Sequence, residues 1–490
     1  ARAAARAAAG GRVAEQARWL EAAADAHAQA GMARERFDAL EQLAVAMRES
    51  RGADEARSRA QALLALADGP GERARALVQV GACGLNEAHF EAAMQVFDEA
   101  IAAAEAAGDT HTAQHARYLQ ALAASHTLGL DEALRRIEPL RPWAEALQDD
   151  SLRHSFLADL AIVYDQADRR RRARPLFERT LAYFDARHET SNAAPARALY
   201  ARSLLMLGDP EGACAQLEIA VRDRRVAAAG DAGHGIELLN LGRVYCELGR
   251  YRETLALLGP ELERLDTEAG AVVRGAVALV LARVQIHLGQ PARALQLLKA
   301  LRLQAPFHQQ AMRAWTEALL AQERPRDRAA LLAQALACFD GQADLPFLRL
   351  PILFDQLAGE ADAQALAALR EAVAECEARE LPAPQLLGRA RLMQVLGACG
   401  RADDALTVAR NLFADLDRIK PVGCYLPELY AAIRDAALAG GDSVLAGQAL
   451  DSAVAWIDTV ARKHLPPLGR EAFVQRNPVN RALLAAVTAR

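Results

Sequence analysis

One pattern of apolar and small residues recurs about every 40 residues through much of this 490-residue chain, a spacing typical of repeat proteins. Six segments align without gaps, and each carries a glycine or an alanine where two helices would approach most closely. These positions are Gly81, Ala121, Ala161, Ala201, Gly242 and Ala282. A fixed period of this length indicates stacked supersecondary units. Because each unit buries its apolar face against its neighbours, we expect an elongated array with an extended inner surface.

The segment that begins at Leu238 shows the pattern most fully. It contains Leu238, Asn240, Leu241, Gly242, Tyr245, Leu248, Gly249 and Tyr251, followed by Thr254, Leu258 and Glu261. This pattern resembles the tetratricopeptide repeat (TPR), in which small residues of a first and a second helix face each other. The period departs from the usual TPR period of about 34 residues, because it is longer. It resembles the longer repeats of large bacterial ATPase-linked signalling and transcriptional regulators.

The resemblance implies an all-α, right-handed α-solenoid of about eleven antiparallel helix pairs. A composition rich in Ala, Leu, Arg and Glu agrees with helix formation. Runs of alternating β-branched residues are absent from the sequence, so we expect no sheet. Weaker repeats continue downstream, where turn glycines at 359, 400 and 441 predict tight packing at Ile352, Met393 and Arg434.

We expect four regions along the chain. Residues 1–68 would hold N-terminal helices and first, atypical repeats, and residues 69–301 the regular repeats. Residues 302–462 would hold degenerate repeats, and residues 463–490 a capping segment. Because the chain begins with Ala1 rather than Met, we expect a piece of a larger protein.

The capping segment carries a second resemblance. Its sequence REAFVQRNPVNRALL resembles the end of the repeat region in large bacterial signalling proteins, in which an ATPase module precedes the repeats. The resemblance does not extend to the ATPase, because the sequence contains no G-x-x-x-x-G-K-[ST] loop.

Charge and cysteine usage narrow the function classes. A net charge of −5 provides no overall basic field, so we expect no direct nucleic acid binding by this region. The seven cysteines lie singly, which disfavours zinc and disulfide frameworks and suits a cytoplasmic protein. His111 and His115 lie four residues apart without a third ligand nearby, so we expect no metal or other cofactor. No apolar run is long enough to predict a membrane span.

The repeat register predicts a binding surface. In the tetratricopeptide arrays that this chain resembles, the inner groove includes the residue directly after the small packing residue. That position holds Arg202, Arg243 and Arg283 in three successive repeats. The remaining members of the predicted surface are Tyr118, His126, Glu247 and His287. Because arginine binds carboxylates and phosphates bidentately, the three guanidiniums predict a ladder for an acidic ligand. Chance recurrence of arginine, or pairing with Glu247, is the alternative.

We therefore expect a TPR-like sensor or interaction region of a bacterial cytoplasmic signalling or transcriptional regulator. It would bind a protein, a peptide or a small anionic ligand, away from any membrane, and act without catalysis. The alternative is a constitutive protein–protein scaffold or adaptor. An enzyme is disfavoured because no nucleophile–base pair, metal set or nucleophile-elbow motif is visible in the sequence.

Overall fold

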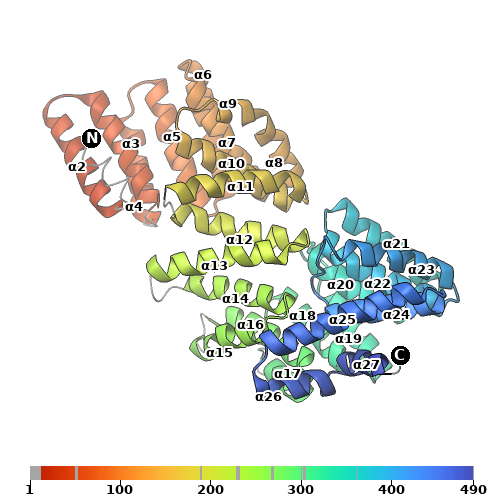
Figure 1. Ribbon diagram of the computed structural model, residues 1–490. Coiled ribbons are helices and arrows are strands. Elements are labelled where there is room, and N and C mark those ends of the chain that lie inside the picture. Colours follow the sequence, from red (N-terminus) through yellow and green to blue (C-terminus); the bar gives the residue numbers. More distant parts are fainter. Residues whose placement is uncertain are drawn as a thin grey trace. The chain divides into compact units, whose positions relative to one another are not determined.

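The computed structural model describes residues 13–49, 53–187, 190–227, 232–265, 270–299, 301, 305–360 and 362–488. This described part of the chain consists of helices and turns and contains no strand. Consecutive helices pack against each other in antiparallel pairs, as Figure 1 shows. The chain is therefore the all-α solenoid of stacked helix pairs that the repeat predicts. The start at Ala1 lies outside the described residues.

The helices fall into two compact units, residues 1–196 and 197–490, and the boundary between them falls within α12 (Thr190–Met206). The elements of the first unit are α2 (Val13–Gln29), α3 (Ala33–Glu49), α4 (Ala53–Leu66), α5 (Pro70–Asn86), α6 (Phe90–Ala106), α7 (Thr110–Thr127), α8 (Leu130–Ile137), η1 (Glu138–Leu140), α9 (Arg141–Glu145), α10 (Asp150–Gln166) and α11 (Arg170–Ala186).

The second unit continues after α12. Its elements are α13 (Pro210–Ala227), α14 (Ala232–Glu247), α15 (Tyr251–Arg264), α16 (Ala271–His287), α17 (Pro291–Lys299), α18 (Phe307–Leu320), α19 (Pro325–Ala337), α20 (Pro346–Leu357), α21 (Ala363–Ala378), α22 (Pro382–Ala398), α23 (Ala402–Asp415), α24 (Leu426–Ala439), α25 (Ser443–Lys463), α26 (Pro467–Glu471), η2 (Ala472–Arg476) and α27 (Pro478–Thr488).

The six small residues of the repeat are all buried, as the register predicts. A Cβ atom added at Gly81 would lie 2.5 Å from Cε1 of Phe97, on the second helix of the same pair. At Gly242 it would lie 2.5 Å from Cδ1 of Leu258. Both distances are shorter than carbon atoms tolerate, so a large side chain of the second helix fills the space that the glycine leaves open.

Local chemistry sets the helix boundaries between these contacts. Asp109, Asp149, Asp362 and Asp442 each precede a helix, and each carboxylate accepts a hydrogen bond from a backbone N–H of the first turn. Such caps satisfy N–H groups that have no partner within the helix. Prolines open several other helices, where their missing N–H costs nothing.

In the second unit the C-terminal segments pack on the turns of earlier repeats. Three consecutive turns carry Gly208, Gly249 and Gly289, each buried and each with a positive φ of 81°, 70° or 68°. We call these three residues the glycine row. A Cβ at Gly249 would lie 2.8 Å from Trp456 of α25, and one at Gly289 would lie 2.8 Å from the backbone nitrogen of Asn477. Gly208 is covered by Ile419 and Lys420 of the connection between α23 and α24.

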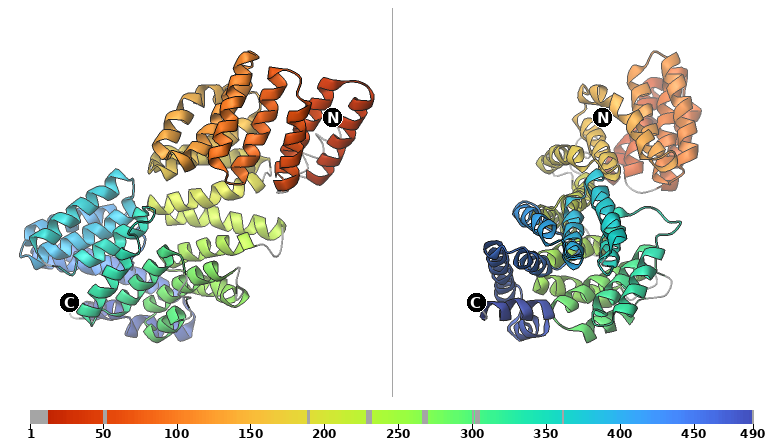
Figure 2. Two further views of the ribbon diagram at one scale, coloured as in Figure 1. Left: turned by 180° about the vertical axis from the view of Figure 1, so that it is seen from behind. Right: turned by 90° about the vertical axis from the view of Figure 1, so that its right-hand side faces the viewer.

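A hydrophobic cluster supports this packing. It joins Cys246, Tyr251, Val284 and Leu288 of the earlier repeats to residues of α25, η2 and α27, among them Ile457, Phe473 and Leu483. The blue C-terminal helices accordingly lie beside the green helices α15–α17 (Figures 1 and 2). Contacts in this unit thus reach well beyond neighbouring repeats, further than a simple stacked array requires.

Candidate binding site

A partly open pocket lies on the face formed by the first helices of the pairs in the second unit, which we call the inner face. Residues of α16, α18, α20, α22 and α24 line it, together with Gly423, Cys424 and Tyr425. These last three belong to residues 416–425, which connect α23 to α24 and which we call the α23–α24 loop. Five first helices and one loop thus converge on this pocket. Of the sequence-predicted residues, Arg283 and His287 line it, and Glu247 bonds to Gly423 at its edge.

Arg283 of α16 is half-buried in this pocket and engages two other segments. Its guanidinium donates a hydrogen bond to the backbone carbonyl oxygen of Gly423. It also lies over the ring of Trp315 of α18, 4.8 Å from the ring centroid, where a cation is attracted by the aromatic face. Arg283 has no carboxylate within 4.0 Å among the described residues, so its charge is not neutralised by an ion pair.

Glu247 at the end of α14 holds the other side of the same glycine. Its Oε2 accepts a hydrogen bond from the backbone N–H of Gly423 at 2.9 Å. Burial raises the pKa of Glu247, while the charge of Arg283 opposes this shift. Both polar groups of one loop residue are therefore satisfied by charged side chains from two successive repeats, an arrangement we call the Gly423 clamp.

Arg243 lies one turn before Glu247 on α14 and remains exposed. Among the described residues it has neither a hydrogen bond nor a carboxylate within 4.0 Å. Desolvation by the surrounding protein lowers its pKa, Glu247 opposes this, and the charge of Arg283 lowers it further. The charge of Arg283 therefore acts on Arg243, which belongs to the preceding repeat. Arg202 is exposed on α12, one repeat earlier.

His287, one turn after Arg283, is buried. Its Nδ1 is 3.0 Å from the hydroxyl of Tyr251, and its ring lies 4.7 Å from that of Tyr425. Burial lowers the pKa of His287 to about 3, and Arg283 contributes to the shift. The imidazole is therefore neutral near pH 7, and its contacts join the C-terminal segments to α15 and α16.

A second polar network forms the far wall of the pocket. Asp355 of α20 is 1% exposed and accepts hydrogen bonds from Nε1 of Trp315 at 2.7 Å and from Nε of Arg391 at 2.8 Å. Arg391 also lies 3.8 Å from Glu428, whose pKa is raised by burial. Because a buried carboxylate is costly unless it is paired and bonded, this network fixes the mutual positions of α18, α20 and α22.

The sequence analysis missed Trp315, Asp355 and Arg391. A signal was present, because Trp315 follows buried Ala314 as Arg283 follows Ala282, and Asp355 lies one full repeat period beyond Trp315. The step from Arg283 to Trp315, however, is shorter than the period of the regular repeats. A search at the fixed period therefore passes over this position.

Two predicted residues lie in the first unit. Tyr118 of α7 is buried, and its hydroxyl donates a hydrogen bond to Asp159 of α10. Burial raises the pKa of Asp159 to about 6, and the bond from Tyr118 opposes the shift. His126 is exposed and stacks on Phe90 with ring centroids 4.0 Å apart. Each of the two side chains thus engages its own neighbour within this unit.

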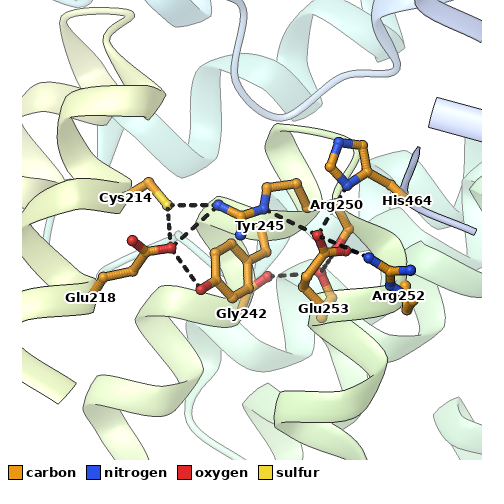
Figure 3. A network of polar contacts seen from close by, with 9 residues as sticks. Cys214, Glu218, Gly242, Tyr245, Arg250, Arg252, Glu253 and His464 are labelled. Atoms are coloured by element: carbon orange, nitrogen blue, oxygen red, sulfur yellow. Dashed lines mark hydrogen bonds and ion pairs between the residues drawn. The ribbon is translucent and has the colours of Figure 1, made fainter. Parts of the chain in front are cut away.

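Figure 3 shows a further polar network on the second unit, made of residues outside the predicted surface. Tyr245 donates a hydrogen bond to Glu218 at 2.9 Å, and the Arg250 guanidinium lies 4.2 Å from the centroid of the Tyr245 ring. On the other side of Arg250, a carboxylate oxygen of Glu253 lies 3.0 Å from Nδ1 of His464. This second contact joins α15 to the end of α25, so the network ties the C-terminal segments to the repeats.

Other kinds of site were sought in the described residues. No group of three or more His, Cys, Asp or Glu side chains is placed to hold a metal ion there. Within the same residues, none of the helices is both long enough and apolar enough to span a bilayer.

Comparisons by sequence find no matching protein-family model and no matching curated protein. Among solved structures, the chain is similar to a signal transduction ATPase with numerous domains (STAND) protein with a tetratricopeptide repeat sensor from Pyrococcus horikoshii. The match has a TM-score of 0.37 and 13% sequence identity, and it covers 76% of this chain and 55% of that one. This chain thus spans about half the length of that protein. Similarity at this level assigns no function.

Proposed function

We propose that this chain is a binding region of a bacterial cytoplasmic signalling or transcriptional regulator, which recognises an anionic group on a ligand or partner protein and performs no catalysis. The observation that carries the proposal is the pair of Arg243 and Arg283. The two arginines occupy the same position in successive repeats, and neither has a carboxylate within 4.0 Å among the described residues. Such a pair attracts carboxylates and phosphates, which arginine binds with two parallel hydrogen bonds.

The surroundings of the pair support recognition of an anion. Trp315 lies against the guanidinium of Arg283, and the carboxylates of Glu247 and Glu428 both interact with the Arg283 charge. Asp355 and Glu428 of the pocket pair with Arg391, whereas Arg243 and Arg283 have no carboxylate within 4.0 Å among the described residues. The proposal needs no reaction at the pocket, where Asp355 and Glu247 accept structural hydrogen bonds and Glu428 pairs with Arg391.

Calorimetric titration of the whole chain tests the proposal. The probes are inorganic phosphate and a hexaglutamate peptide, with a hexalysine peptide as the control of opposite charge. Binding of at least one anionic probe should weaken as NaCl is raised, because salt screens exposed charges. Replacing Arg202, Arg243 and Arg283 together by Ala should abolish it. If the triple variant binds as tightly as the wild type, these arginines are not the site.

The alternative function is a constitutive scaffold. The observation that favours it is that the α23–α24 loop already occupies part of the inner face through the Gly423 clamp. A scaffold would bind its partner regardless of small anions and would show no change at the loop when they are added. The titration above therefore separates the two functions.

A further inference from the structure

We propose that an oxyanion group and the α23–α24 loop compete for Arg283, so that a ligand bound at the candidate site releases this loop from the inner face. This competition rests on the proposed function, because it requires an anion to bind at Arg283, and it couples that binding to a change in the loop. The oxyanion is a phosphate or a carboxylate, carried by a small molecule or by an acidic peptide.

The competition follows from what Arg283 contacts. Its guanidinium holds a neutral acceptor, the carbonyl oxygen of Gly423, rather than a carboxylate. The present bond is charged on its donor side only, whereas an oxyanion adds the attraction between two full charges and can accept two parallel hydrogen bonds. Taken alone, an oxyanion is therefore the better partner. The loop compensates because it is tethered beside Arg283 at a high effective concentration. The oxyanion forms the stronger bond and the loop has the higher effective concentration, so the ligand concentration decides which of them Arg283 binds.

Glu247 couples anion binding at Arg283 to the second hydrogen bond that holds the loop. With the loop in place its carboxylate accepts the Gly423 N–H, and Arg283 opposes the burial that raises the pKa of Glu247. An anion on Arg283 removes part of that compensation and places a second negative charge nearby. Both effects favour the protonated form of Glu247, and a neutral carboxyl is a weaker acceptor for the Gly423 N–H. Both halves of the clamp then loosen together.

The release is confined to one segment. Downstream of the clamp, Tyr425 is buried and donates a hydrogen bond to Asn480 at 2.8 Å, within the hydrophobic cluster that holds α25 and α27. Upstream, the loop meets the glycine row at Gly208, whose carbonyl accepts from the Lys420 N–H at 2.9 Å. The moving part is therefore the backbone from about Pro421 to Cys424, while Ile419, Lys420 and the C-terminal helices stay in place.

Cys424 provides a direct readout, because it follows Gly423 in the loop. Its thiol is half-buried, and burial together with the nearby Glu247 raises its pKa, which keeps it protonated and slow to react. Release of the loop exposes the thiol to solvent and moves it away from Glu247, so the pKa of Cys424 falls and alkylation becomes faster. Alkylation by N-ethylmaleimide, followed for each cysteine by mass spectrometry on the whole chain, measures this. Half-buried Cys399, at the end of α22, is the internal reference.

Variants test the clamp without any ligand. Losing the Arg283 charge would by itself raise the pKa of Cys424 and slow its alkylation. Faster alkylation in Arg283→Gln therefore reports release of the loop, and we expect it to be about tenfold or more, as for losing a charged hydrogen bond. Glu247→Gln removes the charge that raises the pKa of Cys424 but keeps an acceptor oxygen, so its alkylation rate gives the effect of the charge alone. Glu247→Ala removes both the charge and the acceptor, so its rate should exceed that of Glu247→Gln. Arg313→Gln is the matched control, because Arg313 pairs with Glu317 within α18. An unchanged Cys424 rate in Arg283→Gln, together with equal rates in Glu247→Ala and Glu247→Gln, would overturn the proposal.

The probes test the competition. Saturating phosphate or hexaglutamate, at constant ionic strength set with NaCl, should speed Cys424 alkylation in the wild type and leave Cys399 unchanged. A response to both probes points to the oxyanion itself, and a response to hexaglutamate alone points to an acidic peptide. If a probe binds by calorimetry and Cys424 does not respond, the competition is overturned while the proposed function stands. If no anionic probe binds, both are overturned.

Discussion

The regular repeats of the two compact units share one pattern, but the residue at the turn between the two helices of a pair differs. This turn position lies seven residues after the small packing residue. In the first unit this turn position holds Ala88, Leu128 and Asp168, and in the second it holds the glycine row. Ala88 and Asp168 adopt positive φ values of 60° and 59°, which glycine would adopt with less strain. The first unit tolerates these side chains. At the glycine row the turns are covered by the C-terminal segments, so a Cβ has no room.

The comparison separates two demands on a turn residue. One is a left-handed backbone, which alanine and aspartate can meet at a modest cost. The other is close approach of another segment, which only glycine meets. Gly400 shows the first demand alone, because it has a φ of 74° and no atom within 4 Å of an added Cβ. The glycine row shows both demands at once.

The largest effect is expected from Gly289→Ala. The new Cβ would lie 2.8 Å from the Asn477 nitrogen and 2.9 Å from the Ala472 oxygen, which are backbone atoms that cannot move aside cheaply. We expect a loss of about 2–4 kcal/mol in urea unfolding, from overpacking plus backbone strain. Gly400→Ala is the matched control and should cost only about 1 kcal/mol. Equal losses at both positions would remove the distinction between the two demands.

The next effect concerns the packing that both units share. Ala161 is fully buried between α10 and α11, so Ala161→Leu should cost about 1–3 kcal/mol by overpacking. Thermal unfolding with Ala92→Leu as the control checks this, because Ala92 is exposed on α6 and should tolerate leucine. A tolerant Ala161 would mean that the small residues do not set the helix spacing.

A third effect belongs to the first unit and depends on pH. Because burial raises the pKa of Asp159 to about 6, the folded state holds this proton more tightly than the unfolded chain. The associated stability is complete below pH 3.8 and is lost as pH rises through about 6. Asp159→Asn keeps an acceptor for Tyr118 and should therefore be more stable than wild type by about 1–2 kcal/mol at pH 7. The two proteins should converge near pH 4, and a difference that is independent of pH would contradict this.

The smallest effect is expected from Ala88→Gly. Glycine relieves the strain of a φ of 60° but adds freedom to the unfolded chain. The two terms nearly cancel, so the variant should be more stable by at most about 1 kcal/mol. A clear loss of stability in chemical unfolding would show that the Ala88 methyl group makes contacts that outweigh the strain.

The sequence predicted the regular repeats well because their signal is local. Gly81 and Gly242 are read from their place in the period, and their close approach to Phe97 and Leu258 follows from it. The degenerate repeats were harder. Met393 is buried as predicted, yet the glycine that admits a neighbouring ring is Gly388, whose added Cβ would lie 2.6 Å from Phe354. Arg434, which the register also placed at a packing position, is half-buried and bonded to Asp435.

The candidate site could be predicted only in part. The register brought Arg243, Arg283 and Glu247 to one surface, because all three belong to consecutive copies of one pattern. It could not supply Gly423, which lies 176 residues beyond Glu247 and in a connection that the repeat does not encode. Contacts of that kind depend on how many pairs intervene and how each is tilted, and a periodic pattern carries neither quantity.

The glycine row limits how many helix pairs the second unit can gain or lose during evolution. An open array gains or loses a pair by duplication or deletion, because every new interface repeats an old one. In the second unit, Ile419, Trp456 and Asn477 must meet turns that lie one repeat apart. One additional pair between α17 and α24 would shift those three residues away from Gly208, Gly249 and Gly289, which they cover here. The number of pairs in this unit is therefore set by a closure condition, as the number of strands is in a barrel.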